Sequence, residues 1–208
     1  NTLFGTALFD LGSEESASFL LYNVTFQSNY ANYSLRINST DIEEDRQYVT
    51  IEKCKLQDNN IAAMLVRGAG YVAMMETEIH SESSSVEGDI NAYTMRAWQE
   101  DPDMYAELPI NYPMTSDPAP LIDWTSDEIV LLNSKVSDIN WKGAPILYLK
   151  AFTKLCLAYL ELSMISTDFS VLILNLVPSC EVILDGIRIL NIRSSSGASG
   201  VVTLNENQ

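Results

Sequence analysis

An eight-residue pattern of apolar and polar positions recurs six times along the chain. In this octad, positions 1, 3, 6 and 8 hold apolar or small side chains, and position 7 is polar every time. The octads cover residues 19–26, 49–56, 72–79, 129–136, 155–162 and 182–189. Positions 1–3 and 6–8 alternate with the period of two that β-strands require, and the two residues between them allow a bend.

A shorter alternating segment precedes most octads and predicts a second strand in each repeat. Only a few turn residues separate this strand from the octad, as in the stretch from Arg67 to Tyr71. The apolar pairs expected to point inward are Ala7/Phe9, Leu35/Ile37, Met64/Val66, Leu147/Leu149, Leu172/Leu174 and Val202/Leu204. Long helices are not indicated, because the period is two and β-branched and aromatic residues dominate.

Repeats of about 23–30 residues with short strands and variable turns predict a parallel β-solenoid. One coil cannot bury its apolar face alone, whereas stacked coils share a continuous core. The segments "SLRIN", "YVTIEKCKLQDN", "AMLVRGAGYVAMMETEIHS" and "VLILNLVPSCEVILDGIRILNIR" resemble the right-handed parallel β-helix of pectin-lyase-like proteins. More narrowly, they are similar to the long β-helix surface proteins of ciliates and other single-celled eukaryotes. The resemblance implies the fold, and it implies function only weakly, since this fold carries lyases, hydrolases, adhesins and stalks.

The expected fold class is therefore all-β, a parallel β-helix of about six to seven coils with one long inserted loop. Residues 1–80 and 129–208 are expected to form coils, and 81–128 an acidic, proline-rich insertion in the same domain. A β-sandwich is the alternative architecture, but it favours tight Asn-Gly or Asp-Gly hairpins between strands, and these are scarce here.

The insertion also carries the aromatic residues Tyr93, Trp98, Tyr105, Tyr112 and Trp124. Aromatic and acidic side chains together can bind sugars, but such aromatics more often fasten a loop to its domain. We expect Trp98 and Trp124 in particular to cover the side of the solenoid.

The composition of the chain narrows the range of partners that it can be expected to bind. The chain has 208 residues and a formal net charge of -16, which makes nucleic acid an improbable partner, because phosphate binding needs clustered Lys and Arg. No run of about 18 apolar residues occurs, so this segment is not expected to insert into a membrane.

Three sequons lie close together, at Asn23, Asn32 and Asn38. Each has Ser or Thr two residues later and no proline between, which is the acceptor pattern for N-glycosylation. Three in so short a stretch favour a secreted glycoprotein and hence an extracellular or cell-surface location.

No convincing catalytic, cofactor or metal site is present. Asp101, Asp103 and Glu107 are acids of the type that glycoside hydrolysis uses, but in a proline-rich loop they are more often solvated charges. The acidic run 41–45 lacks the glycine spacing of a calcium loop. His80 is the only histidine, which leaves catalytic triads and zinc sites without partners.

The cysteines are expected to stay unpaired. Cys156 aligns with Ile183 of the next coil, which puts Cys180 three residues along the strand and too far for a disulfide. Cys54 is expected to behave as a small buried hydrophobe.

Two sets of residues are candidates for contact with a partner. The outward second positions of the octads are unexpectedly apolar, which is typical of a surface covered by a loop or a partner. They include Leu20, Ala73, Val130, Cys156 and Ile183. The second set comprises Ala7, Phe9, Val202 and Leu204 in the first and last strands, where no capping helix is indicated.

These observations favour a non-enzymatic, N-glycosylated β-helix module with a structural or adhesive role. Its expected protein partner is itself, end to end, or further coils of a parent chain, and glycans are a possible ligand. The alternative is a domain that binds or cleaves polysaccharide with the 81–128 loop.

Overall fold

The computed structural model describes residues 7–11, 17–29, 33–38, 47–59, 63–83, 120–194 and 201–206, and these ranges form strands and bends with no helix. The strands are β1 (Ala7–Leu11), β2 (Ser18–Tyr22), β3 (Thr25–Gln27), β4 (Tyr33–Asn38), β5 (Gln47–Glu52), β6 (Lys55–Gln57), β7 (Ala63–Met75), β8 (Glu78–His80), β9 (Ile122–Leu132), β10 (Lys135–Trp141), β11 (Leu147–Ala158), β12 (Glu161–Thr167), β13 (Leu172–Leu176), β14 (Glu181–Asp185), β15 (Arg188–Ser194) and β16 (Val202–Glu206).

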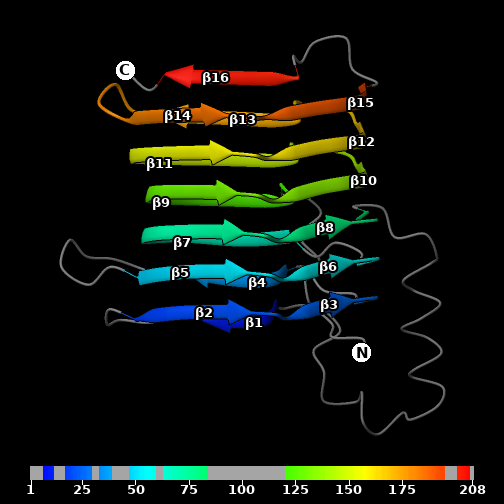
Figure 1. Cartoon of the computed structure of the whole chain (residues 1–208), viewed down its shortest axis with the longest axis horizontal. Coiled ribbons are helices and arrows are strands. Elements are labelled where there is room, and N and C mark those ends of the chain that lie inside the picture. Colours follow the sequence, from blue (N-terminus) through cyan, green and yellow to red (C-terminus); the bar gives the residue numbers. More distant parts are fainter. Residues whose placement is uncertain are drawn as a thin grey trace, which may run out of the picture.

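The strands stack into two parallel sheets that wind around one core (Figure 1). One sheet has ten strands and includes the long strands β7, β9 and β11. The other has six, in the order β15-β12-β10-β8-β6-β3. The expected all-β parallel solenoid is confirmed, with about five turns in the described residues.

The six octads lie in register, one above the other. Position 1 of the octad pairs Phe19 with Val49, Val49 with Val72, and so on through Ile129 and Leu155 to Val182. We number the rungs 1 to 6 by these octads. Parallel pairing in strict register places chemically equivalent side chains about 4.8 Å apart, so each apolar column forms a continuous strip of core.

The bend in each octad has the same backbone conformation in all six rungs. Position 5 adopts a left-handed conformation in every rung, with φ between 48° and 60°, at Asn23, Lys53, Glu76, Asn133, Tyr159 and Gly186. This residue turns the chain from the first sheet into the second. Its N–H donates to the next rung, as Asn23 does to the Glu52 carbonyl at 3.0 Å. A left-handed residue other than glycine costs about 1 kcal/mol. Pairing with neighbouring rungs that repeat the same bend therefore supports this conformation.

A second left-handed bend follows two residues after each octad. Ser28, Asp58, Ser81, Asp138, Met164 and Asn191 all have φ between 53° and 56°. In rungs 4 to 6 this residue lies inside the longer strands β10, β12 and β15. Side chains one position later turn back into the solenoid, so Ile139 and Ile165 are buried there.

The core follows the predicted apolar positions, with one correction. Trp124 is not a loop aromatic that covers the side of the solenoid. It lies in β9 in register with Val66 and Leu149, and it is fully buried. Leu121, Ile122 and Trp124 supply the short strand of rung 4, so residues 120–128 belong to the solenoid, as do 81–83. The remainder of the expected insertion, 84–119, lies outside the described residues.

Side chains at the same octad position in neighbouring rungs should contribute very differently to the free energy of unfolding. Leu157 and Leu184 pair in register, but Leu157 is 0% exposed and Leu184 is 54% exposed. Leu157→Ala is expected to lower the free energy of unfolding by about 2–5 kcal/mol. Leu184→Ala should cost about 0.5 kcal/mol or less, as for surface positions. Urea unfolding of both variants measures the difference, and equal losses would contradict the open end of rung 6.

Candidate functional site

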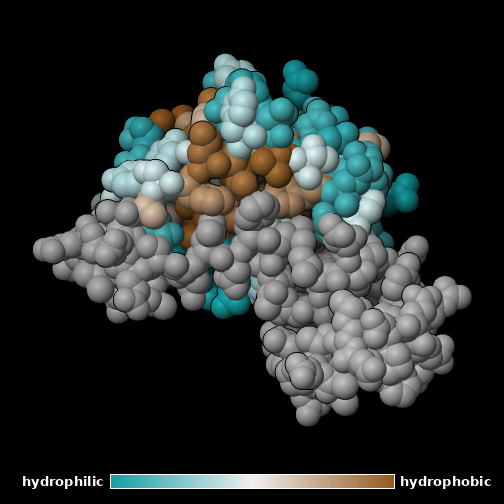
Figure 2. Space-filling view, turned by 90° about the horizontal axis from the view of Figure 1, so that it is seen from below, coloured by the Kyte–Doolittle hydropathy of each residue, from teal (hydrophilic) through white to brown (hydrophobic). Residues whose placement is uncertain are grey.

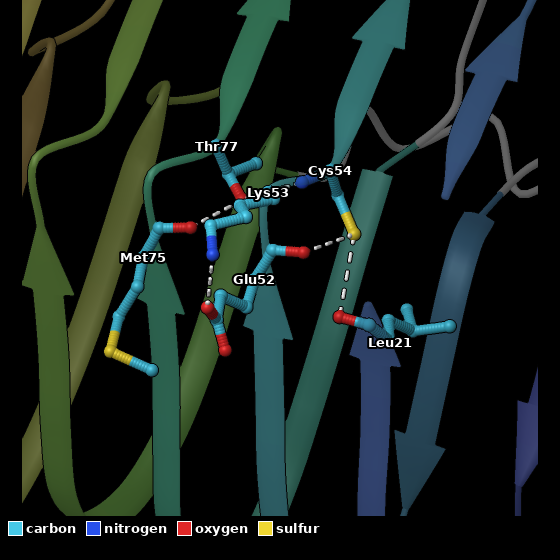
Figure 3. Close-up of polar contacts among 6 residues, drawn as sticks. All are labelled: Leu21, Glu52, Lys53, Cys54, Met75 and Thr77. Carbon is cyan, nitrogen blue, oxygen red and sulfur yellow. Dashed lines mark hydrogen bonds and ion pairs between the residues drawn. The ribbon is translucent and has the colours of Figure 1, made fainter. Parts of the chain in front are cut away.

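The inner side of the first bend holds a short ladder of polar groups (Figure 3). Position 6 carries Cys54, Thr77 and Ser134 in rungs 2 to 4, and all three are buried. Thr77 Oγ1 donates to the Met75 carbonyl at 2.9 Å and accepts the Cys54 N–H at 3.2 Å. Ser134 Oγ repeats the arrangement one rung on, donating to Leu132 and accepting from the Thr77 N–H. The ladder satisfies backbone groups that the bend releases from the sheet.

Cys54 belongs to this ladder, and its thiol contacts backbone carbonyl groups. Its Sγ lies 3.4 Å from the Glu52 carbonyl and 3.5 Å from the Leu21 carbonyl (Figure 3). Burial raises the pKa of the Cys54 thiol, and a thiol held in this protonated state is unreactive. Cys54, Cys156 and Cys180 are all free, so Cys156 and Cys180 do not pair with each other, as predicted.

The second bend holds a different polar column, which sequence reasoning did not find. The residue after the left-handed position is Asn29, Asn59 and Glu82 in rungs 1 to 3, and isoleucine in rungs 4 to 6. Asn59 Oδ1 accepts from the N–H and the side-chain amide of Asn29, both at 2.9 Å. Asn59 Nδ2 donates to the Phe26 carbonyl and to Glu82 Oε1. The sequence signal for this column was the isoleucine at the same position in rungs 4 to 6, because it implies that this position points inward in every rung.

Glu82 ends this column against Ile139 as a buried carboxyl. It is 1% exposed, and its Oε2 has no hydrogen-bond partner among the described residues. Burial raises the pKa of Glu82 to about 8, opposed by the hydrogen bonds from Asn59 and reinforced by the charge of Asp58. A neutral carboxyl is therefore favoured inside the solenoid at pH 7, since an unpaired buried charge is costly.

The outer side of the six-stranded sheet carries a column of alternating charge. Position 7 reads Lys55, Glu78, Lys135, Glu161 and Arg188 in rungs 2 to 6, each in register with the next. Lys135 Nζ lies 3.1 Å from Glu161 Oε1, and this contact lowers the pKa of Glu161. Exposed pairs add little stability individually. Their alternation instead disfavours slippage by one rung, which would place like charges opposite each other.

The expected lateral contact residues form one column, but they differ in exposure. Leu20, Thr50, Ala73, Val130, Cys156 and Ile183 pair in order along the outside of the ten-stranded sheet. Ala73 is fully buried, Val130 and Cys156 are half-buried, and Leu20 and Ile183 are exposed. The column is thus covered in the middle rungs and open towards both ends.

The apolar interior is open at the end formed by β14, β15 and β16. Side chains at positions that are buried in the middle rungs are exposed here: Val182, Leu184, Val202 and Leu204, the last at 65%. Each of these strands pairs with only one neighbour in the described sheets. At the opposite end, apolar side chains gather in the centre of the view along the stack, with polar ones around them (Figure 2). Phe19 and Val24 are half-buried in this first rung.

The other predicted site residues are placed only in part. Asn23 is exposed at the first bend of rung 1. Asn38 is the last residue of β4, with its side chain outside the described set, and Asn32 lies outside the described residues. The side chains of Ala7 and Phe9, the acidic run 41–45 and the acids at 101–107 also lie outside them. His80 is half-buried at a corner, and its Nδ1 is 3.2 Å from Ser137 Oγ.

Within the described ranges, no group of three His, Cys, Asp or Glu side chains is arranged to hold a metal ion. A search of the same ranges found no helix with the length and apolar character needed to cross a membrane.

Comparison with known proteins gave no match: no family model, no curated protein and no solved structure matches this chain significantly. The fold and the arrangement of side chains are therefore the basis for proposing a function.

Removing the Thr77 hydroxyl tests the ladder of the first bend. Thr77→Val keeps the shape but leaves the Cys54 N–H without its acceptor, so the free energy of unfolding should fall by about 1–3 kcal/mol. Thr50→Val, at a half-buried outward position, is the matched control and should change it by about 0.5 kcal/mol or less. Urea unfolding at pH 7 compares the two, and a neutral Thr77→Val would contradict the ladder's role.

Glu82 should make stability depend on pH. Its folded pKa of about 8 lies above the ordinary 4.5, so the folded chain keeps a proton that the unfolded chain releases. The stabilisation is fully present below pH 4.5 and is lost as pH rises towards 8. Between these values, wild type should lose up to about 1.4 kcal/mol per pH unit relative to Glu82→Gln. Urea midpoints from pH 5 to 9 test this, and parallel curves for the two proteins would refute it.

Proposed function

We propose that this protein is an extracellular, N-glycosylated β-helix module with a structural or adhesive role, extended at its ends by further coils. The observation that carries the proposal is the open apolar interior of the last rung, where Val182, Leu184 and Leu204 are exposed. Large exposed apolar surfaces are typical of sites that contact another protein surface.

The edge strands at the two ends favour a partner with the same fold. Among the described strands, β16, β14 and β15 present unpaired edges at one end. At the other end β1, β2 and β3 do so in the corresponding positions of the two sheets. The left-handed bend also lies between corresponding strands, at Gly186 and at Asn23. A coil that stacks on rung 6 therefore extends both sheets by ordinary strand pairing.

The occupant is either a further coil of the same polypeptide or a second copy of the chain. In both cases the contact is heterologous, so it propagates along the stack instead of closing into a ring. A solenoid extended in this way is a stiff, elongated scaffold, which suits a stalk or an adhesin.

The extracellular assignment is supported by the three sequons and by the exposure of Asn23 at a bend. The similarity of the repeat motifs to pectin-lyase-like β-helices, and to β-helix surface proteins of single-celled eukaryotes, agrees with this assignment. A structural role also agrees with the unreactive state of the buried thiol at Cys54.

The test is the solution mass of the 208-residue chain at rising concentration. We expect concentration-dependent assembly, because the isolated chain leaves the end formed by β14 to β16 open. Combining Val202→Lys with Leu204→Lys should abolish assembly, since two charges would be buried without partners.

The matched control is Leu20→Lys, which adds a charge at an equally exposed apolar residue on the lateral surface and should leave assembly unchanged. A wild-type chain that stays monomeric at high concentration, with slow amide exchange in β14 and β16, would overturn the proposal. Loss of assembly in Leu20→Lys alone would instead place the contact on the lateral surface.

A further inference from the structure

Three large side chains are exposed on the lateral surface of rungs 1 and 2, where Tyr48 lies opposite Ser18 and Tyr22 lies opposite Glu52. Leu20 is 60% exposed, Tyr22 52% and Tyr48 53%. They point outward from β2 and β5, which pair in register. We call these three residues the tyrosine patch. Of the three, Leu20 belongs to the outer column that is buried at Ala73 in rung 3.

Asn23 directly follows Tyr22 at the corner between the two sheets. Its φ of 54° marks the left-handed bend, its backbone N–H is engaged by the Glu52 carbonyl, and its side chain is exposed. Thr25, the third residue of the sequon, is also exposed. The acceptor nitrogen is therefore accessible and held beside the patch by a rigid bend.

A side chain at the same corner position already reaches the patch. Lys53 occupies position 5 of rung 2, and its Nζ lies 5.2 Å from the centroid of the Tyr22 ring. It also forms an ion pair with Glu52 at 3.1 Å. Lys53 thus takes one face of the ring. About half of the Tyr22 side chain remains exposed next to Asn23 and can be reached by a group attached there.

We propose that the first sugars of an N-glycan on Asn23 fold back onto the neighbouring Tyr22 and pack against the exposed part of its ring. The C–H face of a pyranose is apolar, and an aromatic ring offers a flat apolar partner, while the sugar hydroxyls stay hydrated at the rim. The inference rests on the proposed function, because it requires a glycosylated chain.

Such a glycan would have a direct consequence for assembly. It would cover part of the exposed apolar surface at Tyr22 and place a bulky hydrophilic chain there. Lateral contact at this part of the solenoid would then be disfavoured relative to stacking along the solenoid axis.

The experiment uses the full chain secreted from a eukaryotic host, with Asn32→Gln and Asn38→Gln so that only Asn23 can carry a glycan. Trimming to a single N-acetylglucosamine isolates the first sugar. Its presence should raise the unfolding temperature by about 2–4 °C relative to Thr25→Ala, which keeps Asn23 but destroys the sequon.

Tyr22→Ser should abolish this glycan-dependent shift. The matched control is Tyr159→Ser, a change at an exposed tyrosine in rung 5 that is remote from the sequon, and it should preserve the shift. Intact mass spectrometry shows first whether Asn23 is occupied. An unoccupied Asn23 would overturn this inference, whereas the glycoprotein part of the proposed function would be overturned by a wild-type chain that carries no glycan at Asn23, Asn32 or Asn38. An occupied Asn23 with the same shift in Tyr22→Ser would overturn only this inference.

Discussion

Each rung of this protein buries its apolar residues against the rungs above and below. The rest of the structure depends on this packing between neighbouring rungs. A single rung has a strip of inward side chains and two rows of unpaired backbone groups, and it has no stable fold alone. Parallel stacking in register satisfies the backbone and closes the core in one step. The two left-handed bends per rung follow from the same constraint, because every bend must match the next for both sheets to continue.

The polar groups inside the solenoid show how the constraint is met where the chain bends. Thr77 and Ser134 serve the released backbone groups at the first bend, and Asn59 serves those at the second. Thr77 and Ser134 each contact their own rung and the preceding one, and Asn59 contacts the rungs on both sides of it. Polar side chains are therefore tolerated in this core where the stack supplies their partners. Glu82 is one exception, since the next rung has Ile139 at the corresponding position, and Trp124 Nε1 and Asn175 Oδ1 are also buried without a partner among the described residues.

Sequence alone predicted the fold well, because position-by-position alternation is a local property that survives any change in loop length. The sequence-based prediction was wrong for Trp124. Asp123, Ser126 and the acidic residues before them made a short strand with inward side chains look like part of the loop. The prediction also missed the Asn59–Glu82 column, because polar residues after a strand are typical of a turn. The alternating charges from Lys55 to Arg188 are visible in the sequence, but their opposition across rungs depends on register. The absence of a capping pattern already indicated that Val202 and Leu204 would be exposed. The exposure of the tyrosine patch depends on what covers each side chain, which only the three-dimensional arrangement shows.

The central claim is that stability passes from rung to rung and falls away at the open end. Amide hydrogen exchange, resolved strand by strand in dilute solution, tests it most directly. The account predicts the slowest exchange in β7, β9 and β11, much faster exchange in β14, β15 and β16, and slower exchange in these three strands as concentration rises. Exchange in β14 to β16 that is as slow as in β9, in a dilute monomer, would contradict it.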